Sequence, residues 1–63
     1  MNLIEELQAE ENRVRQILPF LDSLLRVEAN RAIVFAHQNV AMNSTEGMKD
    51  ALEQLKLFRR STT

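Results

Sequence analysis

The chain has 63 residues, a net charge of −1 and no cysteine, which excludes disulfides, zinc–thiolate sites and thiol chemistry. A composition that is 44% hydrophobic and 27% charged indicates a folded chain, and the near-zero net charge argues against a surface that grips nucleic acid or anionic membrane as a whole. So short a chain lies near the lower limit at which a hydrophobic core alone supports a fold, so we expect association with other copies.

Residue usage favours an all-α protein. One glycine and one proline stand among abundant leucine, glutamate, alanine and arginine, which are good helix formers. The first twelve residues are acidic and lack a long apolar run, so we expect neither a secretory signal nor a transit peptide. No run approaches the ~18 apolar residues of a membrane span. We therefore expect a cytoplasmic protein with no membrane partner, forming a single domain over 1–63.

The first predicted helix runs from about residue 2 to 42. Asn2 is a candidate N-cap, with Glu5 at the spacing of a capping box. Pro19 interrupts the helical period because proline removes one backbone hydrogen bond and clashes with the preceding turn. The flanking sequence ILPFLDSLL is apolar on both sides, which favours a kinked but otherwise continuous helix. The alternative is a break, with Pro19 opening a second helix and the chain folding as a monomeric three-helix bundle.

A short turn at 43–45 is predicted next. Asn43 can end the first helix in a left-handed conformation, and Ser44 or Thr45 can cap a second helix over about 45–60. Gly47 is unfavourable inside a helix by roughly 1 kcal/mol relative to Ala, which is tolerable near an end. Residues 61–63 are expected to fray. Short turns make successive helices antiparallel, so the prediction is a helical hairpin.

Two apolar stripes run along the first predicted helix. The first follows steps of three and four residues, as in a coiled-coil seam, and reads Ile4, Leu7, Glu11, Val14, Leu18, Leu21, Leu25, Glu28, Ala32, Phe35, Asn39, Met42. The second is apolar mainly between residues 17 and 34 and includes Ile17, Phe20, Leu24, Val27, Arg31, Val34, Gln38 and Ala41. The second predicted helix has its own stripe of Met48, Ala51, Leu55 and Phe58.

Unequal helix lengths predict self-association. About forty helical residues span roughly 60 Å, whereas the second helix offers only roughly 24 Å. Folded back, the short helix leaves the stripe between Leu3 and Leu25 uncovered, which is far costlier than associating. We therefore predict an intertwined homo-oligomeric helical bundle, a dimer or trimer. Its predicted interface comprises Ile4, Leu7, Val14, Ile17, Leu18, Leu21, Leu24, Leu25, Ala32, Phe35 and Met42.

Candidate chemistry is sparse. His37 is the only histidine and has no serine or acid beside it in sequence, so we interpret it as a boundary residue bonded to water or a neighbouring side chain. Four glutamates between positions 5 and 11 lack the Glu-x-x-His pairing of carboxylate di-metal bundles and are interpreted as a solvated face. We expect no catalytic residue, no metal and no cofactor.

These features favour a non-enzymatic protein-interaction or regulatory module, of the size typical of phage, plasmid or bacterial accessory proteins. Its partners would be other copies of itself and a second protein. The alternative is a nucleic-acid-binding hairpin dimer that uses the basic face of the C-terminal helix, formed by Lys49, Lys56, Arg59 and Arg60. Glu53 falls in the same row and weakens that patch, so nucleic-acid binding is the less favoured hypothesis.

Overall fold

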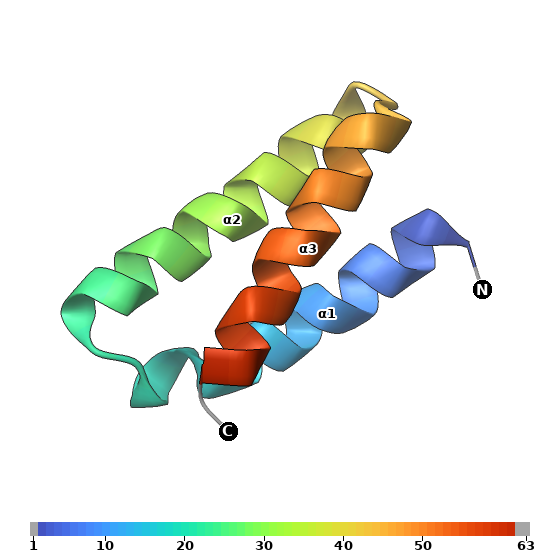
Figure 1. Cartoon of the computed structure of the whole chain (residues 1–63). Helices are drawn as coiled ribbons and strands as arrows, with labels where there is room; N and C mark the ends of the chain where they lie inside the picture. The colour runs from blue at the N-terminus through green and yellow to red at the C-terminus, as the bar shows by residue number, and fades with distance from the viewer. Residues whose placement is uncertain (1, 62–63) are drawn as a thin grey trace.

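The computed structural model describes the backbone of residues 2–61 and the side chains of residues 2–58. It contains α1 (Leu3–Ile17), the short 3₁₀ helix η1 (Leu18–Phe20), α2 (Ser23–Ala41) and α3 (Thr45–Ser61) (Figure 1). Throughout residues 2–61 the regular structure is helical, so the all-α prediction is confirmed. The predicted helix over 2–42, however, is two helices.

The break between α1 and α2 corrects the prediction of one continuous helix kinked at Pro19. Pro19 lies in the first turn of η1, after which Leu21 and Asp22 take extended conformations with ψ angles of 150° and 172°. The Asp22 side chain then accepts a hydrogen bond from the Leu25 backbone N–H at 2.9 Å, which caps α2. Arg26 donates from Nη2 to the Leu21 carbonyl at 3.0 Å. The three-helix alternative therefore describes the course of the chain.

The helix ends at Asn2 and Asn43 form where the sequence predicts them, whereas Ser61, predicted to fray, belongs to α3; residues 62–63 lie outside the described residues. The Asn2 side chain accepts from the Glu5 backbone N–H at 2.8 Å, as expected for the N-cap of α1. Asn43 has a φ of 56°, which is the predicted left-handed conformation. Ser44 N–H donates to the Asn39 carbonyl at 2.9 Å and Asn43 N–H to the Val40 carbonyl at 3.1 Å, the two bonds of a Schellman motif.

Helix α3 lies between the other two helices in the packing. Both α1 and α2 pack extensively against α3, while α1 and α2 contact each other much less; Figure 1 shows α2 and α3 running antiparallel, with α1 behind α3. The core draws residues from all three helices and from the break. It comprises Leu7, Val14, Leu21, Ala29, Ala32, Ile33, Ala36, Met48, Ala51, Leu52 and Leu55.

This arrangement also changes what covers the stripe between Leu3 and Leu25. Because the first helix ends at Ile17 and the chain changes direction there, α1 lies alongside α3. Leu7, Val14 and Leu21 are therefore buried within a single chain. Most of the stripe that was predicted to require a second copy is thus covered by the chain itself.

Small residues occur on the sides of α2 and α3 that face the core. The buried face of α2 carries Ala29, Ala32 and Ala36 together with Ile33 and Asn39. At the start of α3, a Cβ added to Gly47 would lie 1.8 Å from Oδ1 of Asn39. Asn39 is buried and donates from Nδ2 to the Phe35 carbonyl at 2.8 Å. Gly47 therefore leaves space for this buried amide, which helix propensity alone does not reveal.

Candidate functional site

The outward face of α2 exposes three large apolar side chains. Leu24 is 70% exposed, Val27 50% and Val34 54%, and they follow one another at steps of three and seven residues. That spacing places them on one side of a helix. They belong to the second stripe of the sequence, which therefore faces solvent instead of the core.

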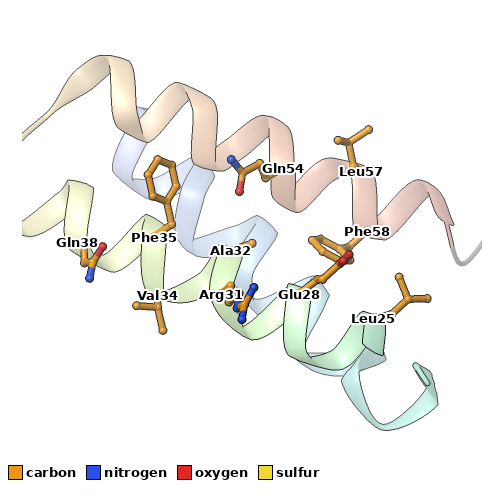
Figure 2. Close-up of a pocket in the computed structure, with 10 residues that line it drawn as sticks. All are labelled: Leu25, Glu28, Arg31, Ala32, Val34, Phe35, Gln38, Gln54, Leu57 and Phe58. Carbon is orange, nitrogen blue, oxygen red and sulfur yellow. The ribbon is translucent and has the colours of Figure 1, made fainter. Parts of the chain in front are cut away.

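Beside this face lies an open cavity of about 660 Å³ between α2 and α3, here called the α2–α3 groove. Figure 2 shows the rings of Phe35, from α2, and Phe58, from α3, projecting into the space between the two helices. Val34 and Leu57 lie at its outer edges (Figure 2), and Leu57 is 57% exposed. The lining is completed by Leu25, Glu28, Arg31, Ala32, Gln38 and Gln54. A groove of this size and lining is suited to apolar side chains presented by another helix.

Two opposite charges lie among the apolar residues that line the groove. Glu28 and Arg31 are both exposed and stand one helical turn apart on α2. Among the ion pairs formed by the described side chains, none involves either residue. The groove thus presents one carboxylate and one guanidinium to whatever occupies it.

A second candidate lies where α1 meets α2. Glu11 Oε1 and His37 Nε2 are 2.5 Å apart, although 26 positions separate the two residues in sequence. Glu11 also accepts from Nε of Arg15 at 2.9 Å. The neighbouring cavity of about 150 Å³ is lined otherwise by Ile4, Leu7, Gln8, Ala36 and Val40. These described lining residues supply no hydroxyl or thiol nucleophile. We therefore interpret the contact between Glu11 and His37 as a structural one that holds α1 against α2.

The predicted interface residues divide by exposure into three groups. Leu7, Val14, Leu21 and Ala32 are buried; Ile17, Leu18, Leu25 and Phe35 are half-buried; Ile4, Leu24 and Met42 are exposed. Leu25, Ala32 and Phe35 line the α2–α3 groove. The structure thus brings only part of the predicted interface to one accessible place.

Several groove residues were missing from the predicted interface. They are Glu28, Arg31, Val34, Gln38, Gln54, Leu57 and Phe58. The second stripe already contained Arg31, Val34 and Gln38, which was the signal that could have found them. The α3 residues could not be placed beside them without knowing how α2 and α3 pack.

The predicted nucleic-acid patch is only partly described. Lys49 is exposed and Lys56 half-buried, with the exposed carboxylate of Glu53 in the same row. The side chains of Arg59 and Arg60 lie outside the described residues. Within the described residues, no group of three or more acidic or histidine side chains is placed to hold a metal ion, and no helix is long and apolar enough to cross a membrane.

Comparisons with known proteins give no match to this chain among family models, curated proteins or solved structures.

Proposed function

We propose that the chain is a small, non-enzymatic protein-interaction module with a regulatory role, and that its working surface is the α2–α3 groove. The proposal keeps the cytoplasmic, cofactor-free setting expected from the composition. The ligand we propose is an amphipathic helix.

One observation carries this proposal: large apolar side chains are exposed around the groove although the chain has a closed core. Val34 and Leu57, which line the groove, are each more than half exposed, and so is Leu24 on the adjoining outward face of α2. Leu55 and Val14, by contrast, are fully buried. Monomeric proteins seldom leave contiguous apolar patches uncovered, and such patches mark interaction surfaces. In helix-in-groove recognition the ligand helix inserts apolar anchors spaced at three, four and seven residues into an apolar groove, and the open space between α2 and α3 can accept such a row.

The test is a selection of displayed amphipathic helical peptides on the full-length protein. We expect selected peptides to carry apolar anchors at helical spacing and to perturb the backbone amide resonances of Val34 and Leu57. Val34→Glu should abolish binding because it places a charge against the apolar anchors. Met42→Glu is the matched control, since Met42 is 73% exposed and does not line the groove. Peptides that bind equally well to Val34→Glu would refute the proposal.

Nucleic-acid binding through the C-terminal helix is the alternative. In its described part, the carboxylate of Glu53 lies in the same row as Lys49 and Lys56, so it would repel a phosphate that approached there. A mobility shift with RNA or DNA that weakens steeply with salt, and that Lys49→Glu removes, would favour this alternative over the groove.

A further inference from the structure

Resting on the proposed function of the α2–α3 groove, we propose that its occupant is helix α2 of a second copy of this chain. The two α2 helices run antiparallel about a two-fold axis, and Glu28 of each copy faces Arg31 of the other.

The register follows from the pattern on α2. Leu24, Glu28, Arg31 and Phe35 follow steps of four, three and four residues, so they share one face of the helix. Reversing the helix about the point midway between residues 29 and 30 exchanges Leu24 with Phe35 and Glu28 with Arg31. Side chains that face each other across an antiparallel two-fold pair are related by this exchange. The face is therefore complementary to a reversed copy of itself.

The charges on α2 favour a second copy of the chain as the partner and an antiparallel orientation of the two α2 helices. An antiparallel second copy places each Glu28 carboxylate against an Arg31 guanidinium, which forms two equivalent opposite-charge contacts at the centre. A parallel copy in register would place Glu28 against Glu28 and Arg31 against Arg31, which is repulsive. Among the described side chains neither residue forms an ion pair, and both line the groove (Figure 2).

Apolar layers on either side of the charges supply the stabilisation. Leu24, 70% exposed in the single chain, would pack against the half-buried ring of Phe35 of the other copy, once at each end of the central charges. Burial of apolar surface drives association, whereas a central ion pair contributes mainly to orientation and register because its desolvation offsets its attraction. Val34 and Leu57 at the groove edges extend the apolar contact.

The experiment is sedimentation equilibrium of the full chain over about 1–200 µM, the range in which homodimers of moderate affinity dissociate. We expect the wild type to dimerise. Glu28→Arg alone and Arg31→Glu alone should each weaken the dimer by more than about tenfold, because each variant places like charges together. Circular dichroism should show unchanged helicity, since both residues are exposed. Glu5→Lys, a charge reversal at an exposed position of α1, should leave the dimer intact.

The decisive step is to mix the two single variants. In the Glu28→Arg chain positions 28 and 31 are both basic, and in the Arg31→Glu chain they are both acidic. Every central contact between the two different chains therefore joins opposite charges, so a heterodimer should form at concentrations where either variant alone is monomeric. A wild-type dimer without this recovery would refute the register.

The two proposals fail by different observations. A helical wild type that stays monomeric throughout the concentration range would refute self-association, yet would leave peptide binding in the groove intact. Peptide binding that persists in Val34→Glu, measured separately, would instead refute the groove as the working surface.

Discussion

Helices α1 and α2 both pack on α3, but they differ in how many of their large apolar side chains they leave exposed. Helix α1 buries two large aliphatic residues, Leu7 and Val14, and leaves none of its leucines more than half exposed. Helix α2 buries one large aliphatic residue, Ile33, with three alanines at positions 29, 32 and 36, and exposes Leu24 on its other side. The apolar content of α1 is therefore directed toward the fold, whereas much of that of α2 is directed toward solvent.

This difference separates stability from recognition within a very small protein. A helix that packs through alanines approaches its neighbour closely and needs few large side chains for the core. Its remaining large apolar residues can then form a surface such as the α2–α3 groove. Substitutions on α1 should accordingly change the free energy of unfolding, and those on the outer face of α2 should change association.

The largest expected effect on the free energy of unfolding is that of a leucine-to-alanine change on α1, compared with the same change on α2. Leu7→Ala on α1 removes a side chain that is 2% exposed, so we expect a loss of about 2–5 kcal/mol in unfolding free energy from lost burial and the cavity left behind. Leu24→Ala on α2, at a 70% exposed position, should change it by less than about 0.5 kcal/mol. Urea denaturation at low protein concentration measures both, and equal losses would break the comparison.

A second effect should arise where α2 meets α3. Gly47→Ala places a methyl group against the Asn39 amide and forces that buried side chain from its hydrogen bond with Phe35. Overpacking typically costs about 1–3 kcal/mol, against a gain in helix propensity of up to about 1 kcal/mol. We therefore expect a net loss of about 1–2 kcal/mol, measured by thermal unfolding.

The control for Gly47→Ala is the same change in an Asn39→Ala background. With the amide removed, the added methyl group has space, and the gain in helix propensity should make Gly47→Ala stabilising. A loss of equal size in both backgrounds would show that contact with Asn39 is not the cause.

Local signals in the sequence predicted much of the fold. The caps at Asn2 and Asn43 and the turn before Thr45 involve hydrogen bonds between residues at most five positions apart, so neighbouring residue types suffice to predict them. The break at residues 18–22 was predicted as a kink because Leu18 and Phe20 are apolar and proline is compatible with either outcome. Asp22, three residues after the proline, was the overlooked capping signal.

The candidate site could not be predicted from local sequence signals, because it is formed by packing between helices that lie far apart in the sequence. Two stripes on one helix showed that α2 faces two environments, but not which stripe faces the core. That depends on α1 folding back along α3 after the break. The contact between Glu11 and His37 spans 26 positions, so no local spacing could reveal it.

The smallest expected effect concerns the residue that starts α2 and so sets its direction away from α1. Asp22→Ala removes the carboxylate that accepts from the Leu25 backbone N–H, and an N-cap of this kind contributes about 1 kcal/mol. Asp22→Asn should retain most of that stability because asparagine caps equally well. Ser23→Ala, at the exposed first position of the helix, should be nearly neutral.

If Asp22→Ala lowered stability no more than Ser23→Ala in thermal unfolding, η1 and the packing of Leu21 would suffice to separate the two helices. A loss near 1 kcal/mol would instead assign part of the separation between α1 and α2 to this single carboxylate.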